Sequence, residues 1–350
     1  MYPTPRLAEL VDIAPEFWKV ENQLYLTRNA TSFDAERAAG LLQWQRNVRS
    51  LHVHFNYTEF RPNPAPEGEF PPNVYVQDPA LPFSFEFVTP RTLRLRMKVG
   101  VEPRKPLEEL MLAGPVPTDS GWRREPRQGG ATYTSEAGVS LSISLEPFHF
   151  EIRDAGGRLV TQAVTDHQRR AMPFAFVRRA GDLRRHLAAT FTLKPDEKIV
   201  GCGESFTRLD KRGQKVFLWT FDAWECQGAE MYKPVPFFMS SEGYGMFVHT
   251  SAPVTLDVGQ THDHFQTIYS GDDELDLFIF VGTPQEILAE YTALTGRSPV
   301  PPLWTFGLWM SRITYDRETQ VREVAARLRS ERIPCDVIHL DTGWFEEDWC

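Results

Sequence analysis

The sequence predicts a mainly β fold, a large β-sandwich, followed by the first βαβ unit of a parallel barrel that is cut short. Three observations predict it. Short segments of alternating apolar and polar residues fill residues 51–282. A capped helical pattern and a cluster of prolines then end that region. Two apolar strands, separated by one amphipathic helix, close the sequence and indicate a parallel sheet.

The composition is that of a folded protein with an acidic balance. Of the 350 residues, 41% are hydrophobic and 24% are charged, and the net charge is -9 with a pI near 5.6. A nucleic-acid partner requires a basic patch that displaces counterions from phosphates. The nearest candidate, Arg123–Arg127, is short and is expected to be a solvated loop. The sequence therefore predicts no nucleic-acid partner.

The sequence also carries no sign of export, of a membrane span or of a metal site. The N-terminus has no basic start followed by an apolar run, and no window approaches roughly 18 uninterrupted apolar residues. The four cysteines are scattered without a CxxC pair, which disfavours a zinc site and a disulfide framework. We therefore expect a cytoplasmic location, no membrane partner, no metal and no other cofactor.

Taken in order, residues 1–50 show no clean period. From 51 to 186, segments such as LHVHF, LRLRM, VSLSISL and FHFEIRD alternate with period two between turns rich in Pro and Gly. This pattern is typical of antiparallel strands with one buried face. The stretches 61–82 and 102–130 are expected to be long, irregular loops.

One hairpin of this region can be placed from its turn residues. The strand FHFEIR ends at Arg153, and RLVTQ returns after the turn Asp154–Gly157. Gly156 and Gly157 can both adopt the positive φ that such turns require. Strand patterns then continue through 187–282.

The sandwich is predicted to end in a helix. Thr283 and Glu286 match a capping box with Pro284 at the first helical position, and Gly296 stands where a C-cap glycine is expected. The prolines between residues 299 and 302 form a stiff linker. We therefore predict an N-terminal β-sandwich domain at 1–298 and, at 299–350, a linker with the incomplete start of a barrel.

The C-terminal stretch has the pattern of one βαβ unit. Trp304–Met310 is an apolar run of strand length, and Asp316 begins a helix with an apolar face that Pro334 stops. Val337–Leu340 follows as a second buried strand, which places Asp341 at its carboxyl end. In parallel barrels this end of the strands builds the active site.

Six short segments, in this order and spacing, resemble family 31 glycoside hydrolases, the α-glucosidase and α-xylosidase family, and most of all its α-xylosidase-like branch. They are GCGESF (Gly201–Phe206), LWTFD (Leu218–Asp222), YKPVPFFMS (Tyr232–Ser240), GYG (Gly243–Gly245), FGLW (Phe306–Trp309) and HLDTGW (His339–Trp344). The resemblance implies a galactose-mutarotase-like sandwich, a (β/α)8 TIM barrel and retaining, exo-acting hydrolysis of terminal α-linked sugars.

Retaining chemistry uses two carboxyl groups roughly 5 Å apart. The resemblance implies that both are aspartates of later barrel strands, and a whole barrel takes about 250 residues. We therefore expect the catalytic pair to lie beyond residue 350 and this chain alone to be inactive. The expected partner is an oligosaccharide or α-glycoside, and homo-oligomer formation by a full-length protein is left open.

The resemblance also implies substrate-binding residues. Asp341 would hold the sugar in the −1 subsite, with a structural acid capping the next loop as the alternative. Asp222 would reach the +1 sugar from a sandwich loop. Trp344 and Trp309 are candidates for stacking on a pyranose ring, against core packing. The residues after Asp341 shape the space around the C5 substituent, so Thr342 and Gly343 leave the choice of sugar open.

Other polar residues are assigned to the scaffold. Glu204, Tyr232 and Lys233 lie in the matched segments but are expected to be structural, and His339 is expected to be a core histidine. Two rival functions stay open. One is a non-catalytic carbohydrate-binding or interaction module, and the other is a mutarotase-like site with His149 and Glu151 on one sheet face.

Overall fold

The computed structural model describes residues 11–52, 57–62, 79–100, 111–165, 172–221 and 228–345. The chain divides into two compact units, residues 1–296 and 297–350, and each is described by itself. The division falls at the end of helix α2 (Pro284–Thr295), just ahead of the proline-rich stretch. No helix within the described ranges is long and apolar enough to cross a bilayer.

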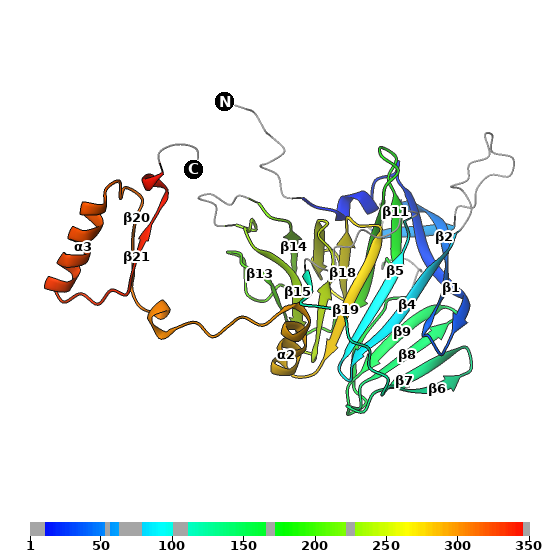
Figure 1. The fold of residues 1–350 in the computed structure, drawn as a ribbon. Coiled ribbons are helices and arrows are strands. Elements are labelled where there is room, and N and C mark those ends of the chain that lie inside the picture. Colours follow the sequence, from blue (N-terminus) through cyan, green and yellow to red (C-terminus); the bar gives the residue numbers. More distant parts are fainter. Residues whose placement is uncertain are drawn as a thin grey trace. The chain divides into compact units, whose positions relative to one another are not determined.

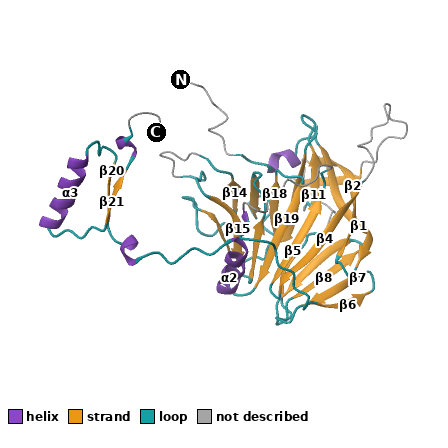
Figure 2. Ribbon diagram, viewed as in Figure 1, coloured by secondary structure: helices purple, strands orange, loops and turns teal. Residues whose placement is uncertain are grey.

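The first unit is built from two antiparallel sheets (Figures 1 and 2). The larger sheet has the order β13 (Ile199–Gly203), β15 (Pro234–Ser240), β16 (Tyr244–Val248), β19 (Glu274–Val281), β5 (Thr92–Lys98), β4 (Ala80–Thr89), β2 (Ala39–His52), β1 (Gln23–Asp34), β11 (Ala175–Arg178), β12 (Arg185–Thr192), β18 (Phe265–Ser270), β17 (Val254–Val258) and β14 (Gln214–Leu218), and β3 (Tyr57–Pro62) pairs with β2 off this path. The smaller sheet has the order β10 (Leu159–Gln162), β9 (Phe148–Arg153), β8 (Ser140–Leu145), β7 (Gly130–Thr134) and β6 (Arg123–Arg127). A 3-10 turn, η2 (Ala14–Phe17), precedes β1. The predicted β-sandwich is confirmed.

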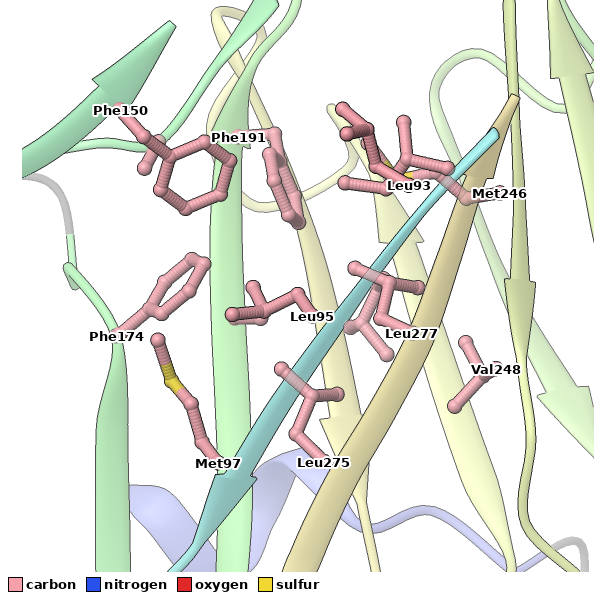
Figure 3. Close-up of a cluster of buried hydrophobic side chains, with 14 of the residues drawn as sticks. Leu93, Leu95, Met97, Phe150, Phe174, Phe191, Met246, Val248, Leu275 and Leu277 are labelled. Carbon is pink, nitrogen blue, oxygen red and sulfur yellow. The ribbon is translucent and has the colours of Figure 1, made fainter. Parts of the chain in front are cut away.

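The core of this unit joins residues of both sheets (Figure 3). Phe150 of β9 meets Phe191 and Phe174 edge to face, with ring centroids 6.1 and 5.9 Å away. Leu95 and Leu277, from the neighbouring strands β5 and β19, are fully buried in the same cluster. Alternation puts these apolar side chains on one face of each strand, and burying a Phe or Leu stabilises the fold by about 1.5–3 kcal/mol.

Strand β19 is buried along its whole length because both of its faces are covered. Leu277 belongs to the core between the sheets, and Phe280 belongs to a second cluster with Ile287 of α2. The ring of Tyr291 on α2 stacks on Phe237 with centroids 3.9 Å apart. This two-sided burial explains why the segment LDLFIFV is nearly continuous in apolar residues.

Helix α2 confirms the predicted capping box. Glu286 N donates to Thr283 Oγ1 at 3.3 Å, and Thr283 N donates to the Glu286 carboxylate at 2.8 Å. The predicted hairpin is confirmed as β9 and β10, which pair antiparallel. Its turn differs in one respect, because Gly157 has a positive φ of 76° and Gly156 does not.

One expectation for the first unit is wrong, and the region 1–50, for which the sequence predicted no element, contains strands. The N-terminal region contains the long strands β1 and β2, whose pairing carries register shifts at Thr27, Ala30 and Ser32. These shifts interrupt the period of two that would have revealed the strands. The stretch 102–130 is not irregular throughout, because the exposed residues Arg123–Arg127 form β6, which pairs with β7. The expected loop 61–82 lies largely outside the described residues.

The second unit contains the predicted βαβ arrangement. Its elements are η4 (Leu303–Phe306), β20 (Trp309–Arg312), α3 (Glu318–Ser330), β21 (Val337–Leu340) and η5 (Thr342–Trp344). The strands β20 and β21 pair in parallel, with Trp309 opposite Val337 and Arg312 opposite Leu340. Parallel pairing through a helical connection is the geometry that the sequence predicted.

The boundaries of these elements differ from the prediction. The first strand begins at Trp309, because Pro302 starts a 3-10 turn in which the Thr305 hydroxyl donates to the Pro302 carbonyl at 2.7 Å. The helix begins at Glu318 rather than at Asp316. It ends at Ser330, ahead of Pro334, because Arg332 takes a φ of 57° and reverses the chain.

Candidate functional site

The candidate site centres on Asp341, which directly follows β21. The residue is half-buried, and its Oδ1 accepts a hydrogen bond from Thr342 N at 2.7 Å. The carboxylate therefore caps the turn η5, as the structural alternative proposed. A carboxylate has about four lone-pair sites, so this contact leaves capacity for a ligand.

The two tryptophans lie at different ends of the sheet. Trp344 ends η5, three residues after Asp341, and its ring is 53% exposed and stacks on Phe345 at 4.4 Å. Trp309 begins β20, and its indole N–H donates to Thr305 O at 3.0 Å. At about 3.3 Å per strand residue, Trp309 is roughly 10 Å or more along the sheet from the Asp341 end. The structure thus brings Trp344, and not Trp309, close to Asp341.

The turn η5 is fastened to the loop after β20. Gly343 N donates to Ile313 O at 2.9 Å. In that loop Arg312 Nε donates to Thr314 Oγ1 at 2.7 Å, and the Arg312 guanidinium lies over the ring of Tyr315. Tyr315 is 1% exposed, which anchors the loop. The contact is not predictable from the sequence, because Ile313 and Gly343 are far apart in the chain.

Asp222, the second predicted ligand, lies outside the described residues. The chain is described up to Phe221, whose N–H donates to Met231 O at 3.1 Å and closes the base of that loop. Beside it lies a cavity of about 210 Å³ at the end of β14. Its lining includes Trp219, which is 41% exposed, and the hydroxyl residues Thr250 and Ser251.

The matched glycine motif on β13 has a structural cause. Gly201, Cys202 and Gly203 all have positive φ values. A Cβ on Gly203 would lie 2.2 Å from Lys233 O, so this strand packs directly on the backbone that leads into β15. Glu204 and Lys233 approach to 3.7 Å and are both highly exposed. The glycine contact is structural, whereas an ion pair this exposed contributes little stability, so the scaffold role of Glu204 and Lys233 stays a prediction.

Two histidines are singled out in the sequence, His149 for a mutarotase-like site and His339 as a core residue, and the structure gives little support to either assignment. His149 Nε2 lies 3.8 Å from Glu151 Oε1 on β9, but Arg153 also donates to Glu151 at 2.7 Å. Burial lowers the pKa of His149, and Glu151 partly offsets this. The expectation that His339 is a core residue is wrong. It is exposed and lies 3.0 Å from the Ser311 hydroxyl, because β20 and β21 form a sheet of only two strands within the described residues.

Among the described residues, no group of three or more His, Cys, Asp or Glu side chains lies close enough together to hold a metal ion. Among the described cysteines, Cys202 and Cys335 are free thiols. Burial raises the pKa of the Cys202 thiol to about 12, so it is not a reactive thiolate.

Comparison with known proteins identifies close relatives by sequence. The α-xylosidase XylQ of Lactiplantibacillus pentosus is 36% identical over 208 residues, which are 57% of this chain and 26% of that protein. α-Glucosidase 2 of Bacillus thermoamyloliquefaciens is 30% identical over 217 residues, which are 60% of this chain and 26% of that protein. The chain thus spans about a quarter of the length of these relatives.

Solved structures show the same fold. A family 31 dextranase of Flavobacterium johnsoniae in complex with glucose aligns with a TM-score of 0.67 and 22% identity, over 92% of this chain and 34% of that chain. Residues 82–257 match the N-terminal galactose mutarotase-like domain of glycosyl hydrolase family 31, and residues 298–350 match the TIM-barrel domain of the same family. The chain belongs to glycosyl hydrolase family 31.

Proposed function

We propose that this chain is the N-terminal part of a retaining, exo-acting α-glycosidase of the α-xylosidase or α-glucosidase type. The observation that carries the proposal is the position of Asp341, at the carboxyl end of a parallel strand in the matched barrel domain. That end of the strands builds the active site in (β/α)8 barrels. The names of the two sequence relatives, an α-xylosidase and an α-glucosidase, support the choice of reaction.

In this proposal Asp341 binds the terminal sugar. Its carboxylate accepts hydrogen bonds from adjacent hydroxyl groups, and a hydrogen bond to a charged group contributes about 1.5–3 kcal/mol. The exposed ring of Trp344, on the same turn, offers an apolar surface to the C–H face of the pyranose. Together they would fix which end of the saccharide enters the site, as exo-action requires.

Bond cleavage is assigned to other residues. Retention of configuration requires a nucleophile and an acid/base carboxyl group about 5–5.5 Å apart. We assign this pair to barrel strands that are not represented in these 350 residues, so the 350-residue chain by itself is expected to bind weakly and to cleave nothing. Asp222, on the sandwich loop, stays a proposed ligand of the +1 sugar.

The test uses the protein as its gene encodes it. Hydrolysis of p-nitrophenyl α-D-xyloside and α-D-glucoside is followed by proton NMR, which identifies the anomer released first. The proposal predicts release of the α-anomer. The ratio of kcat/KM for the xyloside to kcat/KM for the glucoside identifies the preferred sugar. Release of the β-anomer, turnover of neither substrate, or turnover by the isolated 350-residue chain would each contradict it.

A second candidate function, a carbohydrate-binding module, is favoured by the cavity beside Trp219. The cavity of about 210 Å³ has the exposed Trp219 indole and Ser251 in its lining, and an indole face can stack on a sugar ring. Titration of the 350-residue chain with maltotriose, followed by tryptophan fluorescence, tests it. Saturable quenching that Trp219→Ala abolishes and Trp304→Ala preserves would support the module, since Trp304 is a similarly exposed control. Absence of quenching would exclude it.

The cellular location is part of the proposal. Free thiols at Cys202 and Cys335 suit the reducing cytoplasm, where disulfides are rare. We therefore propose a cytoplasmic enzyme that acts on imported or intracellular saccharides. Cell fractionation with an antibody to this chain checks the location, and recovery in the medium or the periplasm would contradict it.

A further inference from the structure

The geometry points to Gly343 as a positioning residue for Asp341. The turn Thr342–Trp344, held by Gly343 directly against the backbone of Ile313, is called here the η5 latch. The inference rests on the proposed function, because it assumes that Asp341 binds the sugar. It adds that the sheet fixes the direction of that carboxylate through a contact that only glycine permits.

The contact is too close for any side chain. A Cβ on Gly343 would lie 1.9 Å from Ile313 O, 3.0 Å from Ile313 C and 3.3 Å from Thr314 Cα. Non-bonded atoms do not approach to 1.9 Å, and the obstructing atoms belong to the backbone. The φ of Gly343 is not in the left-handed region. The need for glycine is therefore steric, and not a matter of backbone conformation.

The backbone at Ile313 is held in place by the residues on either side of it. Ile313 directly follows β20, whose ladder with β21 fixes Arg312 opposite Leu340. Tyr315, two residues on, is 1% exposed and packs under the Arg312 guanidinium. A larger residue at Gly343 would thus displace η5 rather than the Ile313 side, because Trp344 of η5 is 53% exposed and Tyr315 is buried.

Displacement of η5 also moves the carboxylate of Asp341, which binds the sugar in the proposed function. Asp341 precedes the turn, and its Oδ1 accepts from Thr342 N at 2.7 Å. This hydrogen bond orients the carboxylate, so the N–H and the carboxylate move together. A misplacement of about 1 Å in an active site lowers the rate by roughly 100-fold.

The chain offers a matched control for glycine replacement. Gly307 lies before β20, at the opposite end of the same two strands, and a Cβ there would meet Asp336 Oδ2 at 1.7 Å. The obstructing atoms all belong to the Asp336 side chain, whose Cγ and Cβ would lie at 2.6 and 3.1 Å, so rotation of that side chain with a small local shift relieves the contact. Gly307→Ala therefore makes the same substitution in the same unit against a side chain rather than against the backbone.

The experiment measures kcat and KM for p-nitrophenyl α-D-xyloside and α-D-glucoside with the protein as its gene encodes it. Gly343→Ala is expected to lower kcat/KM by roughly 100-fold, and Gly307→Ala by less than about 3-fold, with similar melting temperatures. In Gly343→Ala/Asp341→Asn the loss should equal that of Asp341→Asn alone. A purely structural role would instead multiply the two losses.

A second pair of variants keeps the test decisive if Gly343→Ala does not fold. Thr342→Pro removes the N–H that orients Asp341, and the extended backbone of Asp341, with φ −91° and ψ −174°, accepts a following proline. Its partner is the double variant Thr342→Pro/Asp341→Asn. The latch predicts a large loss of kcat/KM for Thr342→Pro, and the same loss in the double variant as in Asp341→Asn alone.

The outcomes separate the inference from the proposed function. If Asp341→Asn leaves kcat/KM unchanged, the proposed role of Asp341 is wrong, and the inference that Gly343 positions it is overturned as well. If Asp341→Asn lowers kcat/KM but Gly343→Ala and Thr342→Pro do not, or if the losses multiply in the double variants, the latch alone is overturned.

Discussion

Arg94 and Asp276 form an ion pair inside the large sheet. Arg94 Nε and Nη2 each donate to one Asp276 carboxylate oxygen at 2.7 Å, and the two side chains are 5% and 1% exposed. His249 Nδ1 lies 2.8 Å from the same carboxylate. Removing two charges from water is costly, so such a pair contributes little net stability while intact, but losing Arg94 leaves the buried Asp276 carboxylate without its guanidinium partner.

Arg94→Met is therefore expected to lower the free energy of unfolding by about 3–5 kcal/mol. The control is Arg322→Ala, which breaks an ion pair with Glu318 whose side chains are 77% and 76% exposed. That change should cost less than about 0.5 kcal/mol. Urea denaturation of both variants measures the difference, and equal costs would show that the buried pair is dispensable.

His186 on β12 makes stability depend on pH. It is 5% exposed, and burial lowers its pKa, assisted by Arg179 and Arg184 and opposed by Glu16 and Asp182. Below an unfolded pKa of about 6.5 the unfolded chain takes up a proton that the folded chain refuses, so stability falls as the pH decreases. His186→Gln should reduce this fall between about pH 7 and 5 in thermal unfolding. An unchanged pH profile would contradict the assignment.

At the scale of elements, segments with local signals were predictable from the sequence. Helix α2 carries its start signal in Thr283 and Glu286 and its end signal in Gly296, and the structure has the helix between them. Strand β1 has no such signal, because its bulges near Ala30 shift the side chains out of alternation. The end of α3 depends on the positive φ of Arg332, which nothing in its residue type indicates.

The capping box of α2 yields a test. Thr283→Ala removes the side chain that accepts from Glu286 N, and should destabilise the first unit by about 0.5–2 kcal/mol. Thr292→Ala in the same helix removes only an exposed hydroxyl that bonds Leu288 O within the helix, and should be nearly neutral. Equal effects in chemical denaturation would mean that the cap is not a stability determinant.

At the scale of the whole molecule, the candidate site was only partly predictable. Asp341 was found because the sequence places it after an apolar strand, and its sugar-binding role came from the family resemblance. Gly343 could not be found this way, because its importance comes from the approach of Ile313, which is brought near by the parallel pairing of β20 and β21. A steric requirement between residues distant in sequence leaves no local pattern.

The most direct test of the account is the effect of Asp341→Asn on hydrolysis by the protein as its gene encodes it. The substitution preserves the shape and the hydrogen bond from Thr342 but removes the charge that would bind two sugar hydroxyls. At about 1.5–3 kcal/mol for each charged hydrogen bond, kcat/KM for the preferred p-nitrophenyl α-glycoside should fall by roughly 100-fold or more, without loss of folding. A variant that retains kcat/KM within about 3-fold of the wild type, roughly half a kcal/mol, would contradict the claim that this chain carries the sugar-binding aspartate of an α-glycosidase.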